Sequence, residues 1–182
     1  EEVERQLLVA GILRRIAGEL EGALMALDGS IWIRVEGMDG RVERLAFVHM
    51  PRDAERGEVE LVSYNWDSAG GTLERWSRVV PENDARFRGW LGWCPGGPRG
   101  RVALPEGYRQ RRERVMEGVT RFCVEFRDRD GAILPAEEGI VFPRCGGGGY
   151  WPFAAEVFLG FETPRGREKL LSGVLNFRAD PL

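Results

Sequence analysis

The sequence contains a single histidine, His49, and only three cysteines among its 182 residues. A catalytic thiol needs a neighbouring histidine, cation or helix N-terminus that lowers its pKa, and general acid–base catalysis most often uses histidine. Three cysteines and one histidine match the ligand count of a zinc site, but no Cys-x-x-Cys spacing is present. We therefore expect neither an enzyme nor a resident metal or cofactor.

Long apolar runs and a strong net charge are also missing. No stretch of about 18 apolar residues is present, which is what a membrane-spanning helix needs, and the first residues do not resemble a secretory signal. The net charge of −3 gives no general attraction to nucleic acid or anionic membrane. The chain as given is expected to be soluble, and its length favours one folded domain over residues 1–182.

The N-terminal part of the sequence has the period of an amphipathic helix. Apolar residues recur there at spacings of three and four, which places them on one helix face, and Asp28-Gly29 is a typical helix end. The pattern predicts a helix over residues 1–27, although glycines at three positions lower its intrinsic stability and make it depend on packing. The apolar residues are Val9, Leu13, Ile16, Leu20, Leu24 and Leu27.

After residue 30 the apolar period changes from 3.6 to 2, which is typical of strands separated by Gly, Pro and Asp turns. The clearest unit is an aromatic-rich hairpin over residues 61–76. The predicted fold class is α+β, with one long N-terminal helix packed on antiparallel sheet in the β-rich part over 30–182. The predicted strands are 31–35, 42–48, 59–64, 73–79, 119–127, 155–161 and 174–177.

This order of elements resembles a known family. A lone N-terminal helix is followed by Gly40-Arg-Val-Glu-Arg-Leu-Ala-Phe-Val48, then by Glu58-Val-Glu-Leu-Val-Ser-Tyr64, whose Gly-Gly turn leads into Leu73-Glu-Arg-Trp76. Met116-Glu-Gly-Val-Thr-Arg-Phe-Cys-Val-Glu-Phe-Arg127 and Ala154-Ala-Glu-Val-Phe-Leu-Gly-Phe161 come next. The sequence resembles the J-type minor pseudopilins of type II secretion, within the type IV pilin-like family.

The resemblance implies a structural subunit near the tip of a type II secretion pseudopilus or a type IV pilus-like filament. It implies a prepilin leader that is cleaved and N-methylated, and then an apolar segment of about 20 residues that anchors the protein in the inner membrane. The soluble domain would lie on the periplasmic side or at the filament tip. The partners would be other minor and major pseudopilins or pilins, and a minor pilin of a DNA-uptake pilus stays an alternative.

Two cysteines lie in similar glycine-rich loops flanked by tryptophan. They are Cys94, in Trp93-Cys94-Pro-Gly-Gly-Pro98, and Cys145, in Arg144-Cys145-Gly-Gly-Gly-Gly-Tyr-Trp151. In an envelope protein such a pair most simply forms a disulfide, and closing a loop of about 50 residues stabilises by roughly 4 kcal/mol in the chain-entropy model. Cys123 alternates with its strand neighbours and is predicted to be a small buried residue.

Other polar clusters have simpler interpretations than a site. Asp128, Asp130 and Gly131 carry only part of a calcium-loop spacing and favour a charged turn. The pair Glu137 and Glu138 lies beside Pro135 and Gly139, as in a solvated turn. The basic run over 109–114 is typical of a solvated helix face or a salt-bridge strip between subunits, with contact to DNA phosphates as the less favoured alternative.

Two candidate binding surfaces follow from these patterns. On the helix, Leu8 and Ile12 lie partly away from the main apolar stripe, next to Gly11 and Gly18, and this strip is predicted to contact helices of neighbouring subunits. The alternative function is an extracellular ligand-binding β domain in which an aromatic loop stacks on sugars or peptides. The aromatic residues are Trp90, Trp93, Tyr150 and Trp151.

Overall fold

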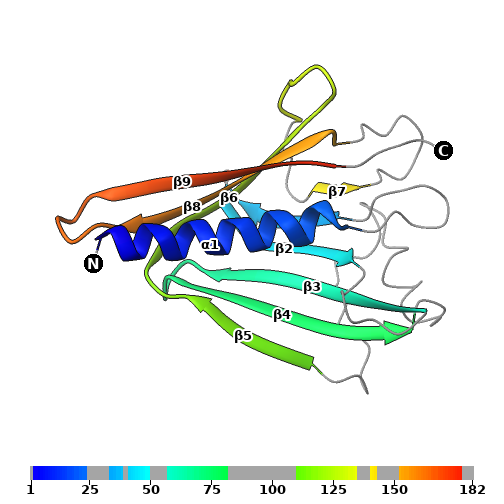
Figure 1. The fold of residues 1–182 in the computed structure, drawn as a ribbon, viewed down its shortest axis with the longest axis horizontal. Helices are drawn as coiled ribbons and strands as arrows, with labels where there is room; N and C mark the ends of the chain where they lie inside the picture. The colour runs from blue at the N-terminus through cyan, green and yellow to red at the C-terminus, as the bar shows by residue number, and fades with distance from the viewer. Residues whose placement is uncertain are drawn as a thin grey trace.

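The structure, a computed structural model, contains one helix and nine strands in its described parts (Figure 1). The described residues are 2–23, 33–38, 41–49, 57–81, 110–134, 140–142 and 152–177. The helix α1 spans Glu2–Glu21, and every strand pairing is antiparallel. The strands form two separate sheets of six and three strands.

The larger sheet has the order β5-β4-β3-β2-β1-β7. Its hairpin of β3 and β4 is fully in register from Glu58 opposite Pro81 to Asp67 opposite Thr72, which confirms the predicted hairpin. Gly71, at a φ of 63°, takes the left-handed conformation that this tight turn requires. The strand bounds are β1 Ile33–Met38, β2 Arg41–His49, β3 Glu58–Asp67, β4 Thr72–Pro81, β5 Gln110–Met116 and β7 Ile140–Phe142.

The smaller sheet has the order β6-β8-β9, with β6 at Val119–Arg127, β8 at Ala154–Glu162 and β9 at Glu168–Asn176. The chain passes from one sheet to the other between β5 and β6, at Gly118. This glycine has a φ of 69°, and a side chain on it would collide with the guanidinium of Arg5. The corner is fixed on the other side by Trp66, whose indole N–H donates to the carbonyl of Val119 over 3.2 Å.

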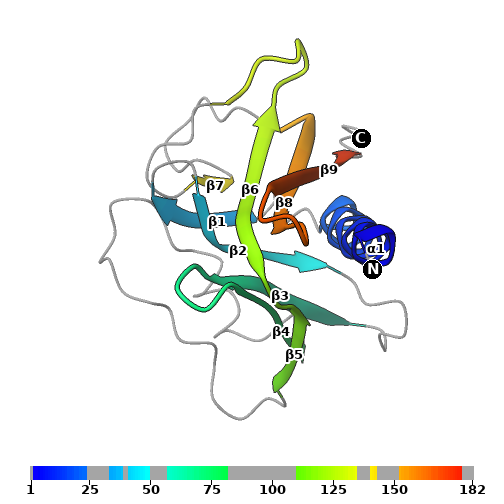
Figure 2. The same ribbon diagram turned by 90° about the vertical axis from the view of Figure 1, so that its left-hand side faces the viewer.

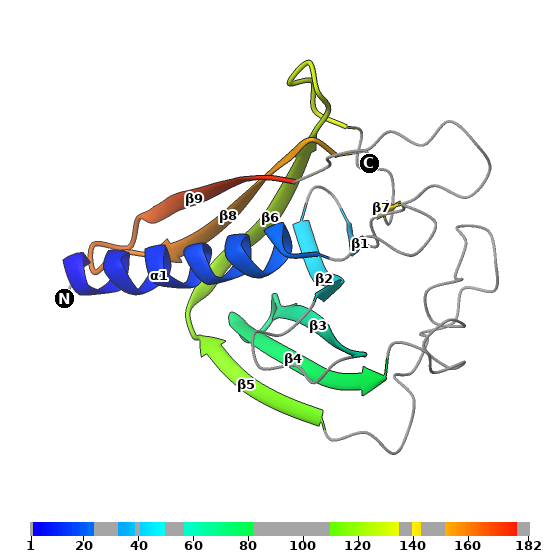
Figure 3. The same cartoon turned by 45° about the vertical axis from the view of Figure 1, so that its right-hand side comes forward.

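The helix lies in the angle between the two sheets (Figures 2 and 3). It packs mainly on β9 and β8, and it also contacts β2 of the larger sheet. The inner face of α1, defined as Val9, Ile12, Leu13, Ile16 and Leu20, belongs to one hydrophobic core that includes Phe47, Tyr64, Phe122 and Phe161. The predicted buried stripe is therefore confirmed at Val9, Leu13, Ile16 and Leu20, whereas Leu24 and Leu27 lie outside the described residues.

The expected α+β class is wrong. The chain has a β-rich fold of two antiparallel sheets with one short helix of 20 residues, instead of a long helix packed on a sheet. The helix is shorter than predicted because it ends at Glu21, and Ala23 already forms an isolated β-bridge with His49. Gly22 provides a typical end for the last turn, so the apolar pattern overestimated the helix.

Two strands were absent from the sequence prediction and one was too short. The run over 109–114 was predicted to be a solvated helix face or a salt-bridge strip between subunits, yet its residues from Gln110 onward belong to β5, at the edge of the larger sheet. Strand β7 is only three residues long, and β9 begins six residues before the predicted 174–177. In β5 the exposed positions are polar or charged and only Met116 is buried, so no apolar alternation indicates a strand.

Candidate interface on the N-terminal helix

The exposed residues of α1 include aliphatic, small and charged side chains. We call the outer face the exposed residues Val3, Leu7, Leu8, Ala10, Gly11, Arg14 and Gly18. The exposed charged residues Glu4, Arg15 and Glu21 lie beside them on the helix surface. Leu8 also lines a hollow beside β5, and Arg14 lines a groove beside β9. Leu7 is 68% exposed and Leu8 is 54% exposed. Nothing lies within 4 Å of the position that a side chain would occupy on Gly11 or Gly18. Small residues beside exposed aliphatic ones allow a second helix to approach closely.

The predicted interface strip is only partly on this surface. Leu8, Gly11 and Gly18 are exposed, but Ile12 is 7% exposed and packs in the hydrophobic core. The prediction that Ile12 remains on the surface is wrong because the helix lies between two sheets. Two packing surfaces bury a wider arc of the helix than the single stripe that the sequence indicated.

Two of the three helix arginines are used within the fold. Arg15 donates to both carboxylate oxygens of Glu113 on β5 at 2.8 Å, and also contacts Glu19 at 3.3 Å. This hydrogen bond with Glu113, opposed by burial, raises the pKa of Arg15 further above its ordinary value. Within the described ranges, Arg14 on the outer face has no hydrogen-bond or ion-pair partner. Arg14 lines the groove between α1 and β9 together with Glu21.

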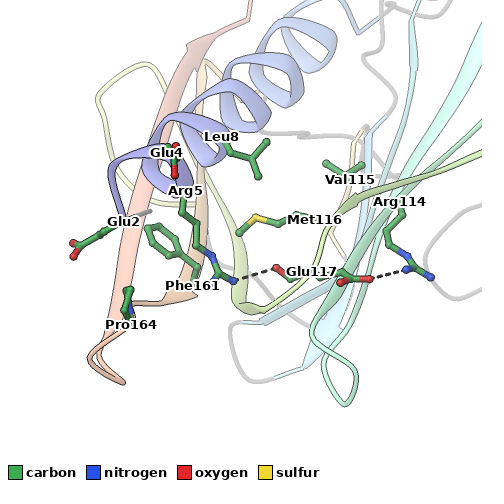
Figure 4. Close-up of a pocket in the computed structure, with 10 residues that line it drawn as sticks. All are labelled: Glu2, Glu4, Arg5, Leu8, Arg114, Val115, Met116, Glu117, Phe161 and Pro164. Carbon is green, nitrogen blue, oxygen red and sulfur yellow. Dashed lines mark hydrogen bonds and ion pairs between the residues drawn. The ribbon is translucent and has the colours of Figure 1, made fainter.

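A hollow of about 550 Å³ lies at the N-terminal end of α1, beside the corner between β5 and β6 (Figure 4). Arg5 projects into it from the helix, donates to the carbonyls of Glu117 and Gly118, and lies 5.7 Å from the ring centroid of Phe161. Arg114 and Glu117 form a 2.6 Å ion pair on the opposite wall. The charged groups here already serve contacts within the protein, so the hollow offers little for an ionic ligand.

Below the helix lies a cluster of charged groups that the sequence analysis missed. The guanidinium of Arg75 on β4 contacts the carboxylates of Glu19 at 3.1 Å and Glu60 at 3.3 Å. Glu60 in turn binds Nε2 of His49 at 2.8 Å. Together with the hydroxyl of Tyr64, which donates to Glu19 over 2.8 Å, these groups connect α1 to β2, β3 and β4. We call these five residues the charge cluster.

Burial and pairing shift the pKa values in the charge cluster in predictable directions. Burial alone would raise the pKa of Glu60, but hydrogen bonds from His49 and Ser77 and the charge of Arg75 outweigh it and lower the pKa to about 2. Burial and the neighbouring carboxylate of Glu19 raise the pKa of Tyr64 above its ordinary value. Burial also opposes the charge of Arg75, but Glu19 and Glu60 raise its pKa overall. Glu60 and Arg75 therefore stay charged at neutral pH.

This arrangement is suited to holding the helix and not to acid–base chemistry. Each group of the charge cluster has a partner within it, and none of them lines the hollow beside Arg5 or the groove between α1 and β9. A group of three or more His, Cys, Asp or Glu side chains placed to hold a metal is absent from the residues that the structure describes. The sequence did carry a signal for the cluster, because Glu60 and Arg75 alternate in phase with buried neighbours on their strands.

Several predicted residues lie outside the described ranges: the suspected disulfide partners Cys94 and Cys145, the aromatic loop of Trp90, Trp93, Tyr150 and Trp151, and the pair Glu137 and Glu138. Cys123 is half-buried, on the face of β6 opposite its buried neighbours, so the prediction of a buried thiol is wrong. Asp128 forms a turn, as predicted, in which its Oδ1 accepts from the amides of Asp130 and Ala132.

No family model matches this sequence, and no curated protein is similar to it. The only helix among the described residues, α1, is not long and apolar enough to cross a membrane.

Proposed function

We propose that the chain is a structural subunit of a pseudopilin-like or type IV pilus-like filament, assembling through the outer face of α1. One observation supports this most: the two sheets and the charge cluster complete the inner face, while the outer face presents exposed Leu7 and Leu8 beside open space at Gly11 and Gly18. An exposed apolar strip on a helix that is already held rigidly is suited to packing against another helix.

The proposal assigns the chain to the cell envelope, with neighbouring pilin-like subunits as partners and no catalytic role. It includes a membrane anchor preceding the present sequence, as the resemblance to J-type minor pseudopilins implies.

The test compares exposed aliphatic residues on and off the outer face. Leu7→Arg and Leu8→Arg are introduced into the full protein in its native host, and Ile133→Arg serves as the control because Ile133 is also an exposed aliphatic residue but follows β6, away from α1. We expect both helix variants to lose co-purification with neighbouring subunits and to reduce secretion or piliation at least fivefold, with the control unchanged. Assembly of the helix variants at the level of the control would refute the proposal.

A further inference from the structure

Within the described residues, strand β9 is the edge of the smaller sheet and pairs with β8 alone. Its register with β8 is regular over all nine residues, from Glu162 opposite Glu168 to Ala154 opposite Asn176. Leu170 and Val174 are exposed, Val174 by 66%. An edge strand presents a row of unpaired N–H and C=O groups on its free side, and such a row is a template for pairing with another strand.

The register identifies which backbone groups point outward. The amide of Phe177 donates to the carbonyl of Phe153 over 2.9 Å, so odd-numbered residues of β9 hydrogen-bond to β8. In an antiparallel ladder the alternate residues direct their N–H and C=O groups to the other side. The amides of Leu170, Ser172 and Val174 therefore point away from β8, toward the free edge.

The edge strands β5 and β9 differ in the features that prevent pairing with a further strand. The edge strand β5 carries Arg111, Arg112, Glu113 and Arg114 in succession, and its register with β4 is interrupted by an irregularity. Charges and bulges of this kind prevent pairing with another strand. Strand β9 has no proline and no bulge. Its two charged residues are already used, because Glu168 accepts from Thr120 at 2.8 Å and Lys169 contacts Glu2 at 3.5 Å.

A groove of about 500 Å³ runs between β9 and α1. Leu171 to Leu175 form one wall, and residues of α1 form the other, including the small residues Ala10, Ala17 and Gly18 and the acidic Glu21. Arg14, which lacks a partner in the described part of the chain, also lines the groove. The groove thus combines unused backbone groups, space for small apolar side chains and two side chains of opposite charge, Arg14 and Glu21.

We propose that this groove binds an extended segment of a partner subunit, which adds to the smaller sheet as a fourth strand beside β9. The segment would place small apolar side chains against α1 and a carboxylate against Arg14. The backbone hydrogen bonds would supply affinity, while the side chains facing the helix would supply specificity. This inference rests on the proposed function in one respect, that the chain has a partner subunit, and it names the segment that the partner contributes.

The probe is a capped heptapeptide, Thr-Val-Thr-Glu-Thr-Val-Thr, whose Val and Glu residues lie on one face of a strand. The matched probe replaces Glu with Lys. Amide hydrogen exchange of the isotope-labelled protein is measured by NMR with each peptide at up to about 1 mM, a concentration that reveals even weak binding. We expect the Glu peptide to slow exchange at Leu170, Ser172 and Val174, with little change at Leu171 and Gly173, which β8 already protects.

Two variants make the test specific. Ser172→Pro removes one outward N–H without removing a bond to β8, as edge strands tolerate, and should weaken peptide binding about tenfold. Arg14→Glu should reverse the preference between the Glu and Lys peptides by about threefold each way, the size expected of an exposed ion pair. The second variant stays informative if the proline variant folds poorly, because Arg14 is exposed.

Slower amide exchange at odd and even positions of β9 alike, or no change at either, would overturn the inference. An Arg14→Glu variant that keeps the wild-type preference between the Glu and Lys peptides would also overturn it. These outcomes are separable from failure of the proposed function. Leu7 and Leu8 lie outside the groove. If Leu7→Arg and Leu8→Arg lose assembly while the unmodified protein does not bind the peptide, the filament role is retained and the added strand is rejected.

Discussion

The two faces of α1 differ in how many of their side chains are buried or paired within the protein. On the inner face, five aliphatic residues are buried, and the neighbouring Glu19 is held by Arg75 and Tyr64. On the outer face, Leu7 is 68% exposed, and Arg14 has no hydrogen-bond or ion-pair partner within the described residues. The same helix is thus fixed on one side and available on the other, which is the arrangement expected of a subunit that must present a rigid surface.

The inner face also shows why packing alone is an incomplete description of the helix position. Aliphatic side chains tolerate small shifts along the groove between the sheets, since apolar contact is non-directional. The hydrogen bonds from Arg75 and Tyr64 to Glu19 are directional and join one helix position to two strands. We infer that the core supplies most of the stabilisation, whereas the charge cluster sets where along the sheets the helix lies.

The largest expected effect comes from placing a charge on the inner face. Ile12→Arg should destabilise the domain by about 3 kcal/mol or more, because an unpaired charge would enter the core and an aliphatic contact would be lost. Leu8→Arg, one helical turn away and exposed, should change stability by less than about 0.5 kcal/mol. Urea denaturation followed by circular dichroism measures both. Equal effects at the two positions would remove the distinction between the faces.

An intermediate effect should appear on acidification. The pKa of Glu60 is about 2 in the folded protein and 4.5 when unperturbed, so its contribution is fully present above about pH 4.5 and is lost as pH falls toward 2. The loss should be on the order of 3 kcal/mol as an upper limit. The test measures the denaturation midpoints of the wild-type protein and of Glu60→Gln from pH 6 to pH 2 and compares the two series.

The Glu60→Gln variant should be less stable at pH 6 and should lose less stability over the same acid range. Other carboxylates also titrate there, so the difference between the two proteins is the informative quantity. Parallel curves for the wild-type protein and the variant would show that Glu60 contributes nothing through its charge.

The smallest expected effect is a gain on the outer face. Gly11→Ala fills open space and removes backbone freedom from the unfolded chain, so it should stabilise the isolated domain by about 0.5 to 1 kcal/mol. Thermal unfolding of the two proteins measures the gain. A decrease in melting temperature would mean that Gly11 has a neighbour on this face and that the outer face is less open than its exposure indicates.

Much of the fold was predictable because local alternation is strong in this chain. Strands near 42–48, 59–64, 73–79, 119–127 and 155–161 were placed by their apolar period, and the hairpin by its Gly-Gly turn. Apolar alternation could not predict strand β5, because its strand conformation depends on pairing with β4 and not on burial of its side chains. The fold class failed because local patterns do not reveal that the strands divide into two sheets.

The candidate interface was predictable in part for a similar reason. Periodicity separated Leu8 from the buried stripe correctly, but the burial of Ile12 depends on a second sheet that no local pattern encodes. The charge cluster joins residues 19, 49, 60, 64 and 75, and only their final register brings them together. Charged residues at core-facing strand positions were the available signal, and partners could not be assigned without the tertiary structure.

The docking of α1 on β9 has a consequence for the order of folding. About 150 residues separate the end of α1 from the start of β9, so during synthesis at 5 to 20 residues per second the helix precedes its main packing partner by roughly 8 to 30 s. A 20-residue helix with three glycines at positions 11, 18 and 22 is marginal by itself in water. Through that interval its apolar residues have no native surface to cover them, and closing the contact joins the two ends of the domain. We therefore expect slow folding of high contact order, in which α1 gains stable structure only after β8 and β9 have paired.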